Sequence, residues 1–407
     1  MTERVATSSP TTVARRVILV TEQVRPGGKR SHVETLRDGL REIGWDATIV
    51  DWARLSWLER AWVAGPLRVL DRFEPALGHR WMIPAFNRRV AIRVRRERNR
   101  GAGPGVIHVQ EAGSYAAARG GAGGWPVVLT VHGPWHREIA MVTGLALEHP
   151  TIRYLRDLEG VAFREADAVI AVDRAHAEYV RSFGRSDRMW VITNFVDTQV
   201  FNDRIPAAPF PDPVERWIAG RPVVFCPRRL TPKNGVPTAV RAMTLLKERG
   251  TRCALVVAGY GPQRDEIERL IRELGVADCV WLLGAVAPGQ MPAWFRRAAL
   301  SVVPSVSIVG VEEATSIAAL EGQACGRPVV ASALGGLREI IEDGDTGLLV
   351  PPGEPAPLAD AIERVLRDAD LAERLSRSGA AAIRDRRSHV AAAREYAAIY
   401  DHVLGSA

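Results

Sequence analysis

Two carboxylates, Glu313 and Glu321, stand eight positions apart in the stretch EATSIAALEGQACGRPVVAS at residues 313–332. The small apolar residues between them predict a helix that begins near Thr315 or Ser316, because either side chain can cap a helix. Glu313 would then lie in the loop before the first turn, and Glu321 would lie about 8–9 Å further along the axis at 1.5 Å per residue. The free N–H groups of the first turn would lie between the two carboxylates and could bind an anion.

A ligand with an anionic centre and hydroxyl groups on either side of it fits this arrangement, and a nucleoside-diphosphate sugar has that order of groups. The stretch resembles the E-x(7)-E signature of retaining glycosyltransferases of family four, which have the GT-B fold. The resemblance implies that Glu313 contacts the donor sugar and that Glu321 holds the ribose diol. It also assigns the start of the helix to donor binding, at Thr315, Ser316 and Ile317. The alternative is that both carboxylates are solvated helix residues, as most surface glutamates are.

A glycine loop follows the first predicted strand, in VILVTEQVRPGGKRSH at residues 17–32. Gly27 and Gly28 allow a ligand to approach the backbone closely, and the helix that follows could hold a phosphate at its N-terminus. The dinucleotide fingerprint G-x-G-x-x-G is absent, and the pattern resembles the GG loop of the same family. Lys29 is expected to contact phosphate or, together with His32, the acceptor. An ordinary strand–helix turn is the alternative.

Histidines occur in or just after two of the predicted strands. His132, in VVLTVHGPWHRE, precedes a Gly-Pro turn and should point into a crevice at the carboxyl ends of parallel strands. In the family a histidine at this place contacts the donor sugar or the acceptor, which implies a catalytic role for His132. Weaker candidates for the acceptor side are His136, His108 and Glu111. A histidine at the end of a strand is otherwise a satisfied polar residue.

Cations are expected where a nucleoside diphosphate departs, because it gains negative charge as the glycosidic bond breaks. The stretch FCPRRLTPKNG resembles the family motif G-R-L-x-x-E-K-G, in which an Arg and a Lys five residues later bind the diphosphate. Arg229 aligns through the Leu that follows it, which puts Asn234 at the fifth position. Arg228 instead stands five residues before Lys233, so the register of the pair is open. Val286 is expected to border the base.

Strand-like and helix-like segments alternate along the chain, which predicts parallel sheets covered by helices on both faces. The predicted strands lie at residues 17–20, 47–50, 106–109, 127–131, 168–172, 190–192, 223–226, 254–258, 280–283, 300–303 and 329–331. The expected architecture is α/β, with two Rossmann-like domains that face a central crevice. We expect an acceptor-side domain at 13–202, a Pro-rich linker at 203–221 and a nucleotide-sugar-binding domain at 222–385. The resemblance implies that a terminal helix at 386–404 crosses back onto the first domain.

The composition of the whole chain limits the classes of protein to which it can belong. The 407 residues carry a net charge of +7 and contain no apolar run of about 18 or more, so no membrane-spanning helix is expected. The N-terminus lacks the apolar core of a secretory signal, and the four cysteines lack metal spacing, which favours a cytoplasmic protein. Arg and Trp crowd residues 52–100, where one helical face could carry Arg89, Arg93, Arg96 and Arg100. That segment predicts peripheral contact with the inner face of an anionic membrane or a wall of the acceptor site, and the alternative is a solvated face over an aromatic core.

Together these patterns predict a retaining, metal-independent glycosyltransferase. It would move a sugar from a UDP- or GDP-sugar to a hydroxyl of a small metabolite, natural product, glycolipid or polysaccharide precursor. Arg229, Lys233 and the N-terminus of the helix after Glu313 would stabilise the leaving group. No metal is expected, because the D-x-D at Asp343–Asp345 lies in DGDTGLLVP, which resembles a turn of the family. No cofactor or nucleic-acid partner is expected either. The alternatives are a nucleotide-sugar epimerase on the same fold and a catalytically inactive glycosyltransferase-like scaffold subunit.

Overall fold

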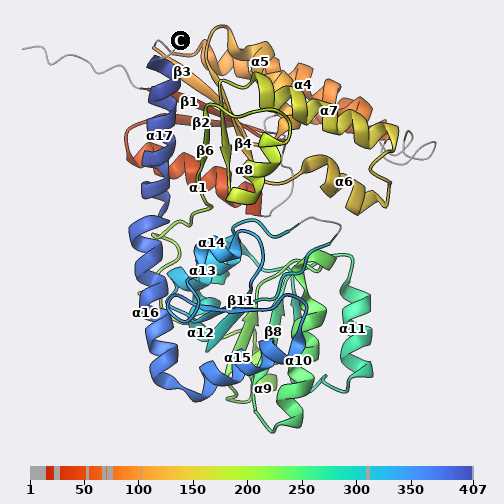
Figure 1. Cartoon of the computed structure of the whole chain (residues 1–407), viewed down its shortest axis with the longest axis vertical. Helices are drawn as coiled ribbons and strands as arrows, with labels where there is room; N and C mark the ends of the chain where they lie inside the picture. Colours follow the sequence, from red (N-terminus) through yellow and green to blue (C-terminus); the bar gives the residue numbers. More distant parts are fainter. Residues whose placement is uncertain are drawn as a thin grey trace, which may run out of the picture.

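Short runs of Val, Ile, Leu and Ala form the strands of two parallel sheets, as strands buried on both faces require. The computed structural model describes residues 15–22, 28–51, 55–66, 70, 77–101, 103–308 and 312–405. The first sheet has the order β2-β1-β3-β4-β5-β6 and the second the order β12-β11-β10-β7-β8-β9. All of these strand pairs are parallel. The result is two α/β domains stacked one above the other (Figure 1).

The strand bounds agree closely with the sequence pattern. The first sheet consists of β1 (Arg16–Val20), β2 (Asp46–Val50), β3 (Gly105–Val109), β4 (Val127–Val131), β5 (Ala168–Ala171) and β6 (Met189–Val191). The second consists of β7 (Val223–Cys226), β8 (Ala254–Ala258), β9 (Val280–Gly284), β10 (Leu300–Val303), β11 (Val329–Ser332) and β12 (Leu348–Val350). β4, β7, β8 and β10 match their predicted bounds, and the other predicted strands shift by one residue. β12 was not predicted, and it lies in a stretch interpreted as a turn.

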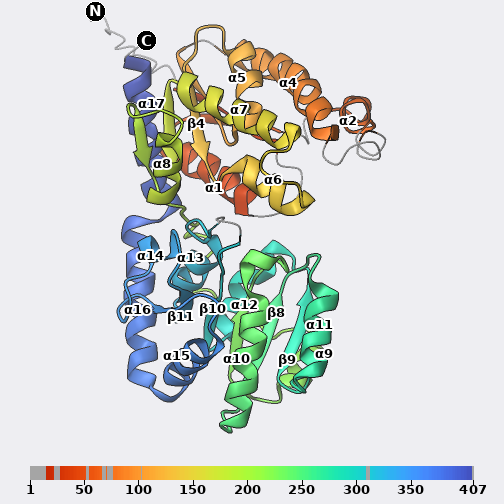
Figure 2. The ribbon, with the colours of Figure 1, turned by 45° about the vertical axis from the view of Figure 1, so that its right-hand side comes forward.

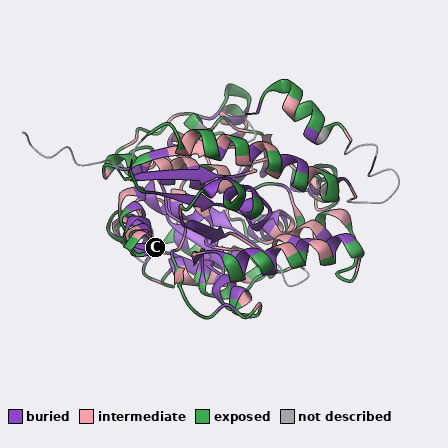
Figure 3. Ribbon diagram, turned by 90° about the horizontal axis from the view of Figure 1, so that it is seen from above, coloured by how far each residue is buried: buried purple, intermediate pink, exposed green. Residues whose placement is uncertain are grey.

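Helices cover both sheets. Those of the first domain are α1 (Gly28–Glu42), α2 (Trp57–Ala64), α4 (Leu77–Arg98), α5 (Tyr115–Ala122), α6 (Trp135–Thr143), α7 (Pro150–Glu165) and α8 (Arg174–Arg181), with the 3₁₀ turn η2 (Ala112–Ser114). Those of the second are α9 (Asp212–Ile218), α10 (Val236–Glu248), α11 (Arg264–Glu273), α12 (Met291–Arg297), α13 (Ile317–Ala324), α14 (Leu337–Ile340), α15 (Pro355–Arg367) and α16 (Ala369–Arg386), with the 3₁₀ turns η3 (Pro232–Asn234) and η4 (Pro288–Gln290). Figure 3 shows buried strands between helices whose outer faces are exposed. Over the described residues, no helix combines the length and the apolar character of a membrane span.

The last helix, α17 (His389–Gly405), leaves the second domain and packs on the first. Its Tyr396 and Tyr400 are fully buried in a cluster with Val17 and Leu36 of the first domain. In Figures 1 and 2, α16 runs along the second domain and α17 continues along the first. The helix predicted at 386–404 is therefore found at the expected place, with a break from α16 at Arg387–Ser388.

Residues 203–221, predicted as a linker, are partly built into the second domain. They contain α9, and Phe210, Val214 and Ile218 are buried in one cluster with Phe225 of β7. Proline is tolerated in the first turn of a helix, so the prolines that suggested a linker stand beside a short amphipathic helix. The part of the segment from Phe210 onward therefore contributes to the core of the second domain.

Candidate active site

A cavity of about 770 Å³ lies between the two domains and is lined by both. The first domain contributes Gly28 and Lys29 at the start of α1 and His132 just after β4. The second contributes the residues after β7 and around the start of α13, namely Arg228, Arg229, Lys233, Asn234, Glu313, Thr315, Ser316, Ile317 and Glu321. These places are the carboxyl ends of parallel strands and the helix N-termini that follow them, where ligands of open α/β sheets bind.

Arg228 is the centre of the polar contacts on the second domain. Its Nη1 lies 3.2 Å from Glu313 Oε1 and its Nη2 lies 2.9 Å from Glu313 Oε2, a two-pronged pairing of guanidinium and carboxylate. The same two nitrogens donate to Ser316 Oγ at 3.0 Å, to Ser305 Oγ at 3.0 Å and to Asn234 Oδ1 at 2.5 Å. The Arg228 residue is only 7% exposed. Arg228 therefore holds Glu313, Ser316 and Asn234 in fixed relative positions.

The pairing keeps Glu313 ionised. Burial alone would raise the pKa of Glu313, but the charges of Arg228 and Lys233 and the hydrogen bonds from Arg228 and Ser316 outweigh it and lower the pKa below its usual value. Glu313 is thus a fixed negative charge at the cavity wall.

The neighbouring Arg229 has a different environment from Arg228. Arg229 is exposed, and its guanidinium lies 5.7 Å from the ring centroid of Tyr260. The sequence left open whether Arg228 or Arg229 is the Arg of the family motif. In the structure Arg228 is buried in the cavity wall, and Arg229 lies at the rim of the cavity. Asn234 serves as a connector, since its Nδ2 donates to Arg229 O at 2.8 Å while its Oδ1 accepts from Arg228.

The start of α13 is shaped by contacts with the first domain. Ser316 is its N-cap residue, but the Ser316 hydroxyl makes no cap hydrogen bond and instead accepts from Arg228. Thr315 Oγ1 donates to Val172 O at 3.1 Å and accepts from Asn194 N at 2.8 Å, both in the first domain. The hydroxyl of Thr315 is therefore engaged between the domains rather than turned to a ligand. The uncapped first turn lines the cavity.

Glu321 lies further along α13 and also lines the cavity. Burial raises the pKa of its carboxyl to about 8. Within the described part of the chain, no side chain or backbone N–H forms a hydrogen bond or ion pair with this carboxyl. The adjacent Gly322 is explained by packing, because a Cβ there would lie 2.6 Å from Ser301 Oγ of β10.

On the first domain, Lys29 and Glu111 meet at the cavity. Lys29 Nζ lies 3.6 Å from Glu111 Oε2, and the hydroxyls of Thr21 and Ser114 donate to the same carboxylate at 3.1 and 2.6 Å. Burial alone would lower the pKa of Lys29, but Glu111, with two further carboxylates, raises it. Lys29 therefore remains a cation at neutral pH.

His132 is a neutral side chain at the cavity wall. Burial and nearby His32 and Lys29 hold the pKa of His132 well below its usual value. Its Nε2 lies 3.0 Å from Gln110 Oε1, which accepts, so Nε2 carries the proton. His32 lies behind it, with ring centroids 4.6 Å apart, and its Nδ1 lies 3.0 Å from Asn194 Oδ1. Burial lowers the pKa of His32 to about 4.

Three histidines that were candidates for the acceptor side do not reach the cavity. His32 supports His132 from behind. His108 is fully buried between Tyr400 Oη at 2.6 Å and Thr130 Oγ1 at 2.7 Å, because its side chain leaves β3 on the face covered by α17. His136 points into the domain and lies 2.5 Å from Glu159.

Three of the residues predicted to bind the donor remain: Gly27, Gly28 and Val286. Gly27 falls outside the described residues. Gly28 lines the cavity, and a Cβ there would meet Ile317 Cδ1 at 3.5 Å, an ordinary contact. Val286 lines the cavity and packs, partly buried, against the cluster that contains Phe225.

Two carboxylates of the site were missed in the sequence. Glu138 on α6 lines the cavity, and its Oε1 lies 3.8 Å from Lys233 Nζ of the other domain. Glu159 on α7 accepts from Trp135 N at 2.8 Å, so it satisfies a free N–H at the start of α6. The only sign of Glu138 in the sequence was weak: it lies in the first turn of the helix that follows His132.

Metal ligands are not grouped in the described part of the chain: no three or more His, Cys, Asp or Glu side chains are placed to hold an ion. Asp343 Oδ1 accepts from Leu349 N at 2.8 Å, so the first Asp of the D-x-D supports the turn that leads into β12.

Comparisons with known proteins match both halves of the chain. A family model described as Glycosyltransferase Family 4 matches residues 26–200, and one described as Glycosyl transferases group 1 matches residues 212–382. An alpha-D-kanosaminyltransferase from Streptomyces kanamyceticus is 31% identical over 282 residues, 69% of this chain and 71% of that protein. A D-inositol 3-phosphate glycosyltransferase from Acidothermus cellulolyticus is 33% identical over 333 residues, 75% of this chain and 67% of that protein. Sucrose-phosphate synthase from Thermosynechococcus elongatus has a similar structure, with a TM-score of 0.72 at 21% identity over 97% of this chain and 100% of that chain.

Proposed function

Because this chain belongs to the family-four glycosyltransferases of the GT-B type, we propose that it transfers a sugar, with retention of anomeric configuration, from a nucleoside-diphosphate sugar to an acceptor hydroxyl. The observation that carries the proposal is the row of groups along the cavity wall of the second domain. An ionised Glu313, an uncapped helix start that lines the same cavity as Lys233, and Glu321, which has no partner among the described residues, follow one another there. They match a sugar, a diphosphate and a ribose in that order.

The chemistry rests on stabilising the leaving group. Lys233 and the N–H groups of the first turn of α13 would receive the charge that develops on the diphosphate. These positive groups are supplied by the chain itself, so we propose a reaction without metal or cofactor. Arg228 is occupied by Glu313, Ser316 and Asn234, and its proposed role is to hold these groups in place.

Retention is proposed to proceed on one face of the sugar. Both oxygens of Glu313 accept from Arg228, which makes this carboxylate a poor nucleophile. The acceptor oxygen would instead attack the anomeric carbon from the side of the departing group. The bond from that carbon to the phosphate oxygen breaks, and the acceptor proton passes to the phosphate. His132, protonated at Nε2, keeps Nδ1 as a lone-pair nitrogen for orienting a hydroxyl.

The acceptor is proposed to be a small polyhydroxylated molecule bound on the first domain. Its wall of the cavity is polar and combines the Lys29–Glu111 pair with Glu138 and the neutral His132. One relative points the same way, since its name describes glycosyl transfer with D-inositol 3-phosphate. The four cysteines are free and buried, in keeping with the cytoplasmic location that we propose.

A donor screen by thermal shift tests the nucleotide assignment. With chelator present, one of UDP-, GDP- and TDP-sugars should raise the melting temperature by several degrees, since ligand at 100 times its Kd adds about 2.7 kcal/mol to stability. The matched control is the same screen on Glu321→Gln, in which the shift should shrink. Stabilisation that appears only after Mn²⁺ is added would contradict the metal-free site.

Peripheral membrane contact is proposed for the surface formed by α2 and α4, which project together from the first domain (Figure 2). Trp57 and Leu58 are 70% and 61% exposed there. Several of its basic groups are already engaged: Arg93 pairs with Glu59 at 2.8 Å, and Arg89 lies 5.0 Å from the ring centroid of Trp62. Apolar insertion by α2 is therefore proposed to contribute more than charge.

Pelleting with anionic vesicles tests this surface. Wild type should pellet, and Trp57→Ser with Leu58→Ser should release it, because exposed apolar side chains would no longer be buried in the lipid. Val191→Ser, which removes a half-exposed apolar side chain on β6, should still pellet. If wild type never pellets, membrane contact is wrong and the acceptor is soluble.

A further inference from the structure

The two chain crossings between the domains are joined to each other. The first crossing follows β6, and the second is the break between α16 and α17. Val196 N donates to Arg387 O at 3.1 Å, and His389 N donates to Val196 O at 3.0 Å, which pairs Val196 with Ser388 in a parallel bridge. The crossings therefore form one strip rather than two independent strands.

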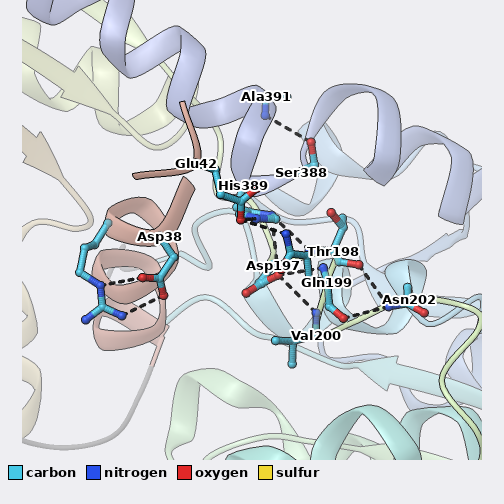
Figure 4. A network of polar contacts seen from close by, with 11 residues as sticks. Asp38, Glu42, Asp197, Thr198, Gln199, Val200, Asn202, Ser388, His389 and Ala391 are labelled. Carbon is cyan, nitrogen blue, oxygen red and sulfur yellow. Dashed lines mark hydrogen bonds and ion pairs between the residues drawn. The ribbon is translucent and has the colours of Figure 1, made fainter. Parts of the chain in front are cut away.

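The ring of His389 lies inside this strip and is 1% exposed. Its Nε2 lies 2.8 Å from Glu42 Oε1, and its Nδ1 lies 3.3 Å from Thr198 N (Figure 4). A carboxylate only accepts and a backbone N–H only donates, so these two hydrogen bonds place a proton on Nε2 and a lone pair on Nδ1, with Asp197 Oδ1 3.7 Å from Nδ1. His389 thus donates to α1 and accepts from the first crossing.

Glu42, the last residue of α1, also contacts the first crossing directly, because Gln199 Nε2 donates to Glu42 Oε1 at 3.0 Å. Asp197 Oδ1 accepts from Gln199 N at 2.8 Å and from Val200 N at 3.3 Å, which fixes the turn of the crossing. We call Glu42, Asp197, Gln199 and His389 the hinge clamp; Figure 4 shows them converging. It ties α1, α17 and the first crossing together.

The helices α1 and α17 pack so closely next to the hinge clamp that they cannot slide past each other. A Cβ on Gly39 of α1 would lie 2.5 Å from His389 O, so the two backbones touch. The first domain and α17 therefore move as one body, and the clamp holds the outgoing crossing against that body. Bending between the domains must then occur beyond the clamped residues.

The two segments that the hinge clamp joins, α1 and the first crossing, both reach the active-site cavity. α1 begins at Gly28 and Lys29, which line the cavity, and the first crossing lines it with Val196, Asp197 and Val200. Building on the proposed function, we propose that His389 is a positioning residue for sugar transfer. By holding the first crossing against α1, it sets the angle at which Lys233 of one domain faces His132 of the other.

Two substitutions at His389 test whether the bridge from Glu42 to Thr198 is needed. Asn offers an acceptor near the place of Nδ1 but does not reach Glu42, whereas the longer Gln amide carries both a donor for Glu42 and an acceptor for Thr198 N. The nucleoside diphosphate binds mainly the second domain, so its Kd should stay unchanged in both variants. Transfer needs both domains, and His389→Asn should lower kcat about tenfold or more, because small misplacements of reacting groups are costly. His389→Gln should remain close to wild type.

The experiment measures kcat, KM for donor and acceptor, nucleotide Kd and melting temperature for both variants and for His402→Gln. His402 is an exposed residue on the same helix whose ring makes an edge-to-face contact with Trp190, and its replacement should be silent. Small-angle scattering on the nucleotide-bound proteins gives a readout independent of turnover: His389→Asn should show a larger radius of gyration than wild type and His389→Gln.

Equal kcat and equal radius in His389→Asn and wild type would overturn the clamp. The clamp would also be overturned if the loss of kcat came together with weaker nucleotide binding and a lower melting temperature. That combination would indicate general destabilisation of the protein. Absence of transfer by wild type would count against the proposed function alone, and the scattering comparison would still decide the clamp.

Discussion

Replacing Arg228 with methionine should lower kcat/KM by about 10²-fold, because Glu313, Ser316 and Asn234 would lose the group that positions them and a misplacement of about 1 Å can cost that much. Glu313 would keep its burial but lose its partner, and its pKa should rise because the largest remaining influence on it is desolvation. Removing one member of a buried ion pair also costs about 3–5 kcal/mol of stability. The melting temperature of Arg228→Met should therefore fall as well.

The matched control is Arg229→Met. Arg229 is exposed at the rim and contacts the Tyr260 ring, so its replacement should cost far less in turnover and leave the melting temperature nearly unchanged. The double variant Arg228→Met with Glu313→Gln should regain part of the lost stability, because no buried charge is left unpaired, but none of the activity. Equal losses for Arg228→Met and Arg229→Met would show that the fork between Arg228 and Glu313 is not the centre of the site.

Glu321→Gln should weaken nucleoside-diphosphate binding by about 10- to 100-fold at pH 8, since hydrogen bonds to charged groups are worth roughly 1.5–3 kcal/mol. The free carboxyl has a pKa of about 8, whereas a ribose diol that donates to it favours the ionised form. Binding therefore releases a proton, and the affinity of wild type should rise as pH increases from 6 to about 8 and then level off. Glu321→Gln should show no such rise.

Titration calorimetry across this pH range, with the nucleoside diphosphate and its 2′,3′-dideoxy analogue, measures the effect. The analogue should bind wild type weakly and bind Glu321→Gln no worse than the parent nucleotide does. Stability gives an independent check. The folded pKa of Glu321 lies above its unfolded value, so the contribution of this proton is complete below about pH 4.5 and is lost as pH rises through about 8. Wild type should lose stability relative to Glu321→Gln over that interval, and parallel profiles would remove Glu321 from the buried site.

The strands, and the grouping of the second-domain residues that line the cavity, could be predicted from sequence because local patterns determine them. Apolar runs such as 223–226 and 254–258 have the length and the β-branched residues that are typical of strands buried between helices. Glu313, Ser316 and Glu321 sit within nine residues of one another, so helix geometry alone relates them. Helix α9 was missed because its prolines resembled those of a linker, although they stand where a helix tolerates them.

Other features depend on contacts that a local pattern does not contain. The choice between Arg228 and Arg229 depends on which of two adjacent side chains turns inward after β7. His108 and His136 were candidates because they lie near strand ends. In the structure a ring nitrogen of His108 is hydrogen-bonded to Tyr400 of α17, and one of His136 is hydrogen-bonded to Glu159. The pairing of Glu42 with His389 joins residues 347 positions apart. Such partners follow from the way the domains and the terminal helix pack.

The most direct test of the central claim is the configuration of the product. The purified chain would be incubated in chelator with the α-linked nucleotide sugar that stabilises it and with a polyhydroxylated acceptor. The one-bond and three-bond couplings at the new anomeric centre would then be measured by NMR. We predict an α-linked product formed at a rate that chelator leaves nearly intact. A β-linked product, or transfer that stops in chelator and returns with Mn²⁺, would contradict it.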